Sequence, residues 1–266
     1  MKKDNVKYLT FPVELLQKAF TDVKGVCSKA IDYGIYLVSR GYAHETNELE
    51  AMQQALDFLG ITSTDVKLLH KHGKILYDSF NSPPLVSVNK DILFDYYKND
   101  KTEFDVAVFC AFCGLRSILG RNAYSKSNRS FMIARMFGYR SQKEFEALPQ
   151  KPPYYVSKFS TKNLQDYHLT ERIIRNELEI GWGLKYYASN IRGFYFSFKC
   201  DIGQLAIYAK SSSKKEVIVN HSKHKKAAIA DALKEFEAAK NRRTPTINNP
   251  PNNPPNNPHD TDEIRF

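Results

Sequence analysis

The stretch RIIRNELEIGWGLKYYASNIRGFYFSF, residues 172–198, contains a change of hydrophobic period that decides the fold. In its first part the apolar residues recur at spacings of three and four, which predicts a helix with Ile173, Ile174 and Leu178 on one face. After Gly183 the period falls to two, so LKYYA and FYFSFK are predicted to pair as a β-hairpin. A helix that runs into a hairpin, in a chain with mostly helical spacing, indicates an α+β protein that is mainly α.

The rest of the chain is predicted to be helical, apart from its proline-rich segments. Apolar residues at helical spacing predict helices over residues 13–20, 26–38, 46–59, 89–97, 104–119, 131–137, 168–180 and 227–240. The prolines between Leu148 and Asn163 predict an ordered excursion with little regular structure. Beyond the hairpin, the segment QLAIYA at 204–209 is a candidate third strand.

Composition excludes several classes of protein. With 266 residues, of which 42% are apolar and 26% charged, the chain is not a collagen, a short disulfide scaffold or a fully disordered protein. Its four cysteines are too few for a secreted disulfide framework, which indicates a reducing cytosol. No window approaches the roughly 18 to 20 apolar residues of a membrane span, and no signal peptide is recognisable, so we expect a cytoplasmic protein without a membrane partner.

The net charge of +10 is concentrated in the second half of the chain. Residues 1–110 carry 13 basic and 15 acidic side chains, whereas residues 111–210 carry 16 and 7. Residues 211–258 carry 9 and 4, and the last eight residues carry 1 and 3. Clustered lysines and arginines gain free energy by releasing the counterions condensed on nucleic acid, so this distribution favours a nucleic-acid partner. A basic surface that only keeps the protein soluble is the alternative.

Residues 104–199, taken as one unit, give a long helix, a short helix, a second helix and a hairpin. In the segment FMIARMFGYRS, Ala134 is small where two helices approach and Gly138 supplies a turn. This order resembles a winged helix-turn-helix domain, as in MarR-type repressors and plasmid or phage replication initiators. The resemblance implies a recognition helix at Thr170–Glu179, preceded by an insertion of about thirty residues where the simple motif allows three or four. The other interpretation places the recognition helix at Gln142–Ala147.

The resemblance implies a role for most basic residues of this unit. Arg172, Arg175 and Asn176 would reach base edges in the major groove. Arg192, at the tip of the wing, would enter a minor groove or contact phosphate, and other cations would hold the DNA backbone without reading its sequence. Alternatively, the helix arginines pair with glutamates of the same helix at the surface. The predicted nucleic-acid-binding residues are Lys126, Arg129, Arg135, Arg140, Arg172, Arg175, Asn176, Lys185 and Arg192.

The octamer RGFYFSFK, residues 192–199, is similar to the first signature of RNA-recognition modules, in which a basic residue and a glycine precede alternating aromatics. Phe194, Phe196 and Phe198 share one face of the predicted strand, and packing on a core explains them better than stacking on bases. The alternative function is binding of single-stranded DNA or RNA on an aromatic platform. That platform would comprise Tyr186, Tyr187, Phe194 and Phe196.

Residues 244–266 are predicted to form a disordered tail, because the repeat NNPPNNPPNNP cannot bury a core. The last eight residues, HDTDEIRF, resemble the acidic tip of bacterial single-stranded-DNA-binding proteins, although Arg265 interrupts the usual ending. The resemblance implies that the tip docks into a basic pocket on a replication or repair enzyme. The residues that would bind such a partner are Asp260, Asp262, Glu263, Ile264 and Phe266.

The chain is therefore expected to contain a helical module at 1–100, a winged-helix-like nucleic-acid-binding domain at 101–210, a basic C-terminal helix at 211–243 and the tail. Cys110 and Cys113 lack a second pair at zinc-ribbon spacing, so we expect two buried apolar side chains, no metal and no cofactor. The predicted function is non-catalytic binding of duplex DNA, in replication or replication initiation of a mobile element or in transcriptional control. A protein-interaction or scaffold component with a basic surface is the alternative from another class.

Overall fold

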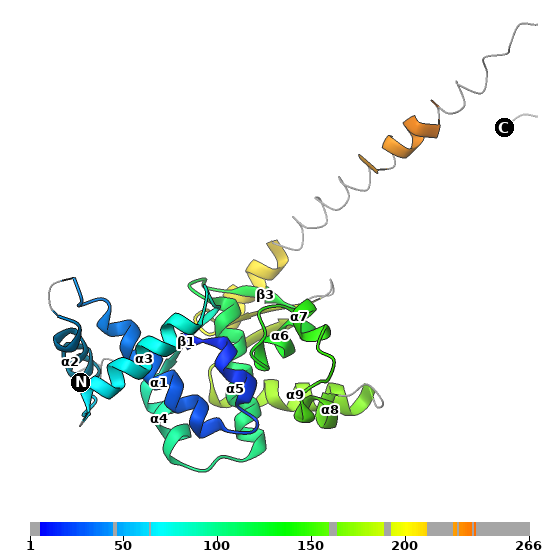
Figure 1. The fold of residues 1–266 in the computed structure, drawn as a ribbon. Coiled ribbons are helices and arrows are strands. Elements are labelled where there is room, and N and C mark those ends of the chain that lie inside the picture. Colours follow the sequence, from blue (N-terminus) through cyan, green and yellow to red (C-terminus); the bar gives the residue numbers. More distant parts are fainter. Residues whose placement is uncertain are drawn as a thin grey trace, which may run out of the picture. The chain divides into compact units, whose positions relative to one another are not determined.

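The computed structural model of the chain describes residues 6–44, 47–63, 65–159, 164–188, 193–211, 226–227, 229–235 and 237. Of residues 164–169 it describes the backbone alone. The chain divides into two compact units, Met1–Ser212 and Ser213–Phe266, and the first holds most of the described residues. That unit is mainly helical with two small antiparallel sheets, which confirms the predicted α+β class (Figure 1).

The first sheet joins two distant parts of the N-terminal segment. Strand β1 (Tyr8–Pro12) pairs antiparallel with β2 (Leu85–Asn89). Successive side chains of a strand lie on opposite faces, so alternate residues enter the core, and Leu9, Phe11 and Val88 are fully buried. Neither strand is predicted from the sequence, because five residues are too few for a clear alternation.

Helix α1 (Val23–Ser39) packs against β1 and against three further helices. These are α2 (Glu48–Leu59), α3 (Val66–Ser79) and α4 (Lys90–Lys98). Each of these four α-helices begins with a side-chain cap, supplied by Asp22, Asn47, Asp65 and Asn89 in turn. Gly60, at φ 64°, ends α2 as predicted. The helices predicted at 26–38 and 46–59 are confirmed as α1 and α2, whereas α3 was not predicted. A short 3-10 helix, η1 (Val13–Lys18), lies between β1 and α1.

The second half of the unit begins with α5 (Glu103–Leu119), in which ten residues are buried. Thr102 and Asp105 form a capping box at its start. Gly114 lets α6 (Arg129–Met136) approach closely, since a Cβ at Gly114 would lie 2.9 Å from the backbone nitrogen of Met136. Three further helices follow, namely α7 (Gln142–Glu146), α8 (Pro153–Phe159) and α9 (Leu164–Gly181).

Helix α8 corrects the prediction that the segment between Leu148 and Asn163 has little regular structure. Pro153 is the first residue of the helix, where its missing N–H group is not needed for a helical hydrogen bond. Tyr154 and Phe159 are buried in the core. Apolar burial therefore stabilises a helix that the proline content alone argued against.

The second sheet has three antiparallel strands in the order β3-β5-β4. Its strands are β3 (Ser125–Ser127), β4 (Lys185–Ala188) and β5 (Phe194–Ser197). Pairing of β4 with β5 confirms the predicted hairpin, whose connection at 189–192 lies outside the described residues. The third strand is β3 and not QLAIYA, which lies within a helix at 202–211. Leu205 and Ala209, one helical turn apart, pack there on Tyr195.

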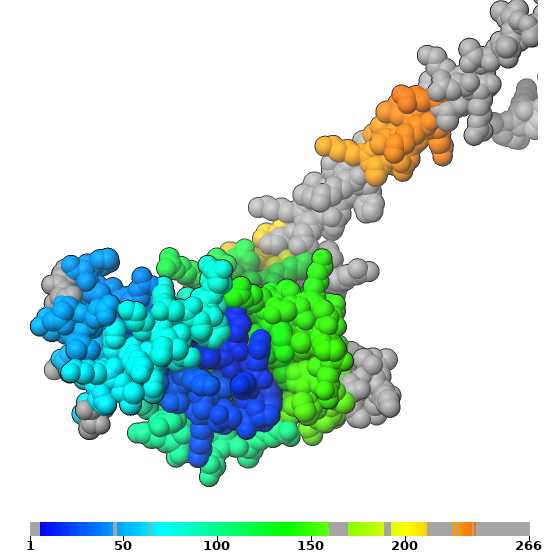
Figure 2. Space-filling model, in the orientation of Figure 1, coloured from blue at the N-terminus to red at the C-terminus, as the bar shows by residue number. Residues whose placement is uncertain are grey.

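We predicted a boundary between domains at residue 100. One hydrophobic core instead includes residues from both sides of that position, and Met1–Ser212 form one compact unit. Phe20 stacks on Phe137 with ring centroids 5.0 Å apart and on Tyr154 at 4.4 Å. Gly138, at φ 80°, approaches Gln17 so closely that a Cβ would lie 2.7 Å from the Gln17 backbone nitrogen. Figure 2 shows the blue N-terminal segment packed directly against the green segment that follows α5.

In the second unit, residues 226–227, 229–235 and 237 are helical, in agreement with the helix predicted at 227–240. Among the described residues, none of the helices combines the length and the apolar character that a membrane crossing needs. Several predicted site residues lie outside the described residues. They are Arg192 in the hairpin connection and, in the predicted tail, Asp260, Asp262, Glu263, Ile264 and Phe266.

Candidate nucleic-acid interface

Two of the predicted DNA-binding arginines meet at one buried carboxylate. The Glu171 side chain is only 4% exposed, and its Oε2 lies 3.4 Å from Nη2 of Arg129. Its Oε1 lies 3.5 Å from Nη1 of Arg175, whose Nε is 3.7 Å from Oε1 of Glu179. The Arg175 guanidinium also covers the ring of Tyr186 at 4.3 Å, and burial raises the pKa of that tyrosine. Arg129 and Arg175 thus connect α6, α9 and β4 inside the fold.

Arg140 and Arg135 are also engaged within the fold. Arg140 Nε lies 2.6 Å from Oε1 of Glu14, and its Nη2 donates to the Asn81 carbonyl at 3.0 Å. Arg135 is partly buried over the Phe131 ring at 5.1 Å, and desolvation lowers the pKa of its guanidinium. Arg140 thus ties the N-terminal segment to the turn between α6 and α7, whereas Arg135 packs on a ring of its own helix. Their predicted role as phosphate contacts receives no support from this placement.

The apolar face predicted for α9 is wrong at one residue. Ile174 and Leu178 are 2% and 1% exposed, as predicted, but Ile173 is 45% exposed. Residues four apart lie on nearly the same line of a helix, whereas Ile173 is turned about 100° from Ile174. The spacing of three and four therefore identified two core residues correctly and placed their neighbour on the wrong side.

The solvent-facing side of α9 has no excess of positive charge among its described side chains. Arg172 and Asn176 are exposed, as contact with base edges requires. Glu177 and Glu179 are exposed as well, and Arg175 is withdrawn by its ion pairs. One exposed cation next to two carboxylates gives a face that phosphates would not favour.

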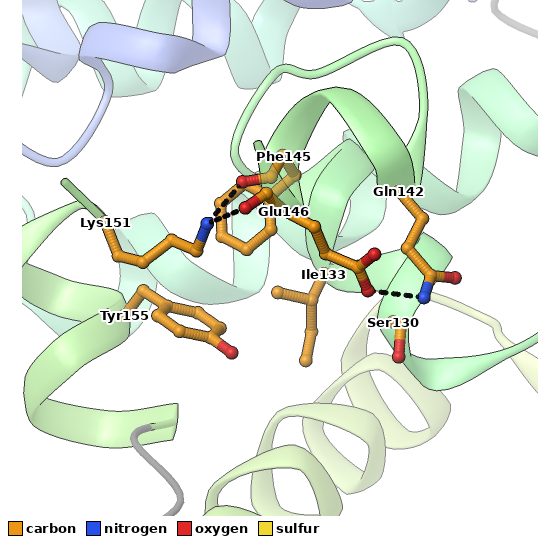
Figure 3. Close-up of a pocket in the computed structure, with 7 residues that line it drawn as sticks. All are labelled: Ser130, Ile133, Gln142, Phe145, Glu146, Lys151 and Tyr155. Atoms are coloured by element: carbon orange, nitrogen blue, oxygen red, sulfur yellow. Dashed lines mark hydrogen bonds between the residues drawn. The ribbon is translucent and has the colours of Figure 1, made fainter. Parts of the chain in front are cut away.

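The other candidate recognition helix, α7, is held down at its C-terminal end. Lys151 Nζ donates to the carbonyl oxygens of Phe145 at 2.7 Å, Glu146 at 2.8 Å and Leu148 at 3.4 Å. Lys151 lines a cavity of about 60 Å³. Gln142 and Glu146, which are joined by a hydrogen bond, line the same cavity (Figure 3). The exposed Lys143 of α7 lies next to the exposed Glu144 and near the exposed Glu146, so this helix offers no cationic reading surface.

Cations do gather on the second sheet. Lys126 of β3 lies opposite Tyr195 of β5, with its Nζ 5.6 Å from the ring centroid. Lys199 Nζ donates to the carbonyl oxygens of Arg121 at 3.1 Å and Asn122 at 3.2 Å, which ties the end of β5 to the start of the β3 segment. Lys185 is exposed on β4. We call Arg121, Lys126, Lys185 and Lys199 the sheet patch.

Ser197 fixes the geometry at the centre of the sheet patch. It lies opposite Lys185 in the pairing of β4 with β5. Its Oγ donates to the Ala123 carbonyl at 2.7 Å and accepts from the backbone N–H groups of Lys199 at 2.9 Å and Cys200 at 2.8 Å. One fully buried hydroxyl thus joins the segment before β3 to the backbone of Lys199 after β5.

The four cations of the sheet patch come from two segments that contain no acidic residue. Residues 106–143 and 180–200 include ten lysines and arginines and neither aspartate nor glutamate. The sheet brings these two segments together, which concentrates positive charge on it. Lys126 and Lys185 were among the predicted site residues, whereas Arg121 and Lys199 were missed. The two acid-free segments were the signal that could have identified them.

The predicted aromatic platform is wrong for two of its members. Phe194 is 4% exposed and Phe196 is fully buried, which confirms their packing on the core. Tyr186 lies under Arg175. Tyr187 is partly buried on the other face of the sheet, beside Tyr195. No base could stack on the predicted set without opening the core.

Cys110 and Cys113 are fully buried, as predicted, and burial raises the pKa of both thiols. All four cysteines are free. In the described ranges no group of three or more histidine, cysteine, aspartate or glutamate side chains is placed to hold a metal ion. A scan against protein-family models found no match for this chain, and searches of curated proteins and of solved structures found none either.

Proposed function

We propose that this chain is a non-catalytic nucleic-acid-binding protein and that the sheet patch contacts the phosphates of duplex DNA. The observation that carries the proposal is that Lys126 and Lys185 of one small sheet, with Arg121 and Lys199 next to its strands, come from two segments without any acidic residue. Cations placed in this way gain by releasing condensed counterions, and they bind the backbone without reading the sequence.

The order of elements supports a winged-helix domain as the frame of this interface. Helices α5, α6 and α9 are followed by the β4–β5 hairpin, which would be the wing, and β3 pairs with its return strand. Lys185 begins the wing and Arg192 lies in its connection. Arg129 and Arg175 form ion pairs with Glu171. In this proposal the wing, and not α9, therefore supplies the main contacts with DNA. Arg172 and Asn176 are the residues of α9 that remain candidates for base contacts.

The biological process we propose is replication or its initiation on a mobile element, with transcriptional control as the alternative. The support comes from the winged-helix resemblance and from the acidic tip HDTDEIRF, which resembles a peptide that docks on replication or repair enzymes. We propose a cytoplasmic location, supported by four free cysteines of which three are buried.

Fluorescence anisotropy with labelled duplex DNA, oligo-dT and RNA over a salt series tests the proposal. If four cations meet phosphates, log affinity for duplex should fall against log salt with a slope of about −3 to −4. Absence of binding to all three probes at low salt would reject the proposal and favour the scaffold alternative. Tighter binding to oligo-dT than to duplex would favour the single-strand alternative.

A further inference from the structure

The face of the second sheet that turns away from the main core carries tyrosine rings. Tyr195 of β5 lies opposite Tyr187 of β4 on one side and opposite Lys126 of β3 on the other. Tyr124, just before β3, packs against the same group. This face therefore combines three phenol rings with a lysine of the sheet patch, which is the combination that binds single-stranded nucleic acid elsewhere.

A single helix covers this face. Residues 202–211 place Leu205, fully buried, and Ala209, 1% exposed, on Tyr195. Tyr208 stacks on Tyr124 with ring centroids 4.3 Å apart and an interplanar angle of 9°. These residues form a small cluster that is separate from the main core. The cover thus depends on few apolar contacts.

Within the part of the chain that the structure describes, the covered state leaves the Tyr195 hydroxyl without a hydrogen bond. The Tyr195 hydroxyl is buried and has no hydrogen-bond partner among the described residues. A buried hydroxyl without a partner destabilises the state that buries it, because water would satisfy the hydroxyl once the site opened. The helix at 202–211 therefore buries the Tyr195 hydroxyl in its own contact with the sheet, and this burial weakens the contact.

We infer that the tyrosine face, defined as Tyr124, Tyr187 and Tyr195, binds the bases of single-stranded nucleic acid when the helix at 202–211 leaves it. The rings stack on bases, which is tolerant of sequence, and the sheet patch holds the backbone phosphates at the rim. The helix is then a reversible cover, and its departure exposes the face without disturbing the opposite face, where Phe194 and Phe196 remain in the core. The phosphate part of this inference rests on the proposed function, whereas the stacking part is independent of it.

The test weakens the cover in the full-length chain and measures binding of oligo-dT and of duplex DNA by anisotropy. Leu205→Ala removes buried contact with Tyr195, so the uncovered population and the affinity for oligo-dT should rise about tenfold, in proportion to that population. Ile207→Ala is the matched control, because Ile207 lies on the same helix and is 67% exposed. It should change neither affinity. Adding Tyr187→Ala to Leu205→Ala should remove the gain.

Tyr195→Phe moves the equilibrium in the opposite direction. It keeps the ring for stacking and removes the unpartnered hydroxyl, so the cover closes more tightly and the affinity for oligo-dT should fall about threefold. If Leu205→Ala does not fold by circular dichroism, Tyr208→Ala takes its place, because it removes the stack on Tyr124 from the exposed side of the helix. The same rise is expected.

An unchanged affinity for oligo-dT in the folded cover variant would overturn the inference, and so would an equal rise in Ile207→Ala. Duplex binding separates this failure from that of the proposed function. Wild-type protein that binds duplex with the expected salt slope, while the cover variant gains nothing on oligo-dT, refutes the cover alone. Wild-type protein that fails on duplex, while the cover variant gains on oligo-dT, refutes the duplex proposal alone.

Discussion

The arginines between α6 and α9 and the cations of the sheet patch contribute equally to the net charge of the second half of the unit. They differ in the number of carboxylates near them. Arg129 and Arg175 share the buried carboxylate of Glu171, and Arg140 pairs with Glu14 from the other end of the unit. The strands of the second sheet lie in two segments, 106–143 and 180–200, that contain no acidic residue. Net charge along the chain counts both groups equally, so placement and not charge separates cations that hold the fold from cations that offer a surface.

The helices and the sheet differ in this way for a physical reason. A partly buried arginine needs a carboxylate or a carbonyl to replace its water, so the core-facing side of α9 carries Glu171 together with Arg175. A lysine at the edge of a short strand keeps its ammonium in water while its aliphatic stem lies along the sheet. The charge of such a lysine remains in water, where it can meet a ligand.

The largest expected effect is the loss of the shared carboxylate. Glu171→Ala should lower the free energy of unfolding by about 2–3 kcal/mol, because it removes the buried carboxylate that two partly buried guanidinium groups share. Glu177→Ala, on the exposed side of the same helix, should change it by less than about 0.5 kcal/mol. Denaturant unfolding of both variants measures the difference. Equal stability of the two variants would mean that Arg129 and Arg175 are solvated like the sheet cations.

Arg140→Ala should have an intermediate effect. It removes the ion pair with Glu14 and the hydrogen bond to Asn81, which together should stabilise the fold by about 1–2 kcal/mol. Duplex affinity should stay within about twofold, because one distant cation contributes little. Thermal unfolding and anisotropy on the same sample measure both quantities, with Lys143→Ala as an exposed control nearby. A large loss of affinity at unchanged stability would return Arg140 to the interface.

Arg172→Ala should have the smallest effect. Arg172 is exposed on a face shared with glutamates, so stability should change by less than about 0.5 kcal/mol. Affinity for a duplex of random sequence should fall less than about threefold, whereas a base-reading arginine contributes about 1–3 kcal/mol at its own site. Anisotropy against a pool of duplexes, followed by selection of bound sequences, distinguishes these cases. A selected motif that Arg172→Ala abolishes would place α9 in the groove.

Much of the fold followed from periodicity, and the errors have identifiable causes. The long helices α1, α2, α5 and α9 and the hairpin were predicted, because long segments give clear apolar spacing. Strands β1, β2 and β3 were missed because they are very short. The segment QLAIYA was misassigned because a short apolar run fits a strand and a helix equally well. The boundary at residue 100 was misplaced because contacts such as Phe20 with Phe137 are distant in sequence.

The candidate site was less predictable than the fold. Charge per segment identified the second half of the unit, but no local pattern shows that Arg140 would meet Glu14, 126 residues away. Lys126 and Lys185 were identified from the sequence, yet their association with Arg121 and Lys199 depends on the pairing of β3 with β5, and β3 was not predicted. Residues that are joined only by sheet pairing need the register before they can be grouped.

Two fourfold variants with equal net charge compare placement with total charge most directly. One neutralises the sheet patch by Arg121→Gln, Lys126→Gln, Lys185→Gln and Lys199→Gln. The other removes four exposed lysines of the first hundred residues by Lys18→Gln, Lys29→Gln, Lys67→Gln and Lys71→Gln. Both substitutions reduce the net charge of +10 by four, to +6.

The salt dependence of duplex affinity, measured by anisotropy on these two proteins after their folding is confirmed by circular dichroism, is the decisive measurement. The sheet variant should lose about 3–4 from the slope of log affinity against log salt, whereas the control variant should keep the wild-type slope to within about one. Equal loss of slope in both variants, or a larger loss in the control, would contradict the assignment of the sheet as the nucleic-acid interface.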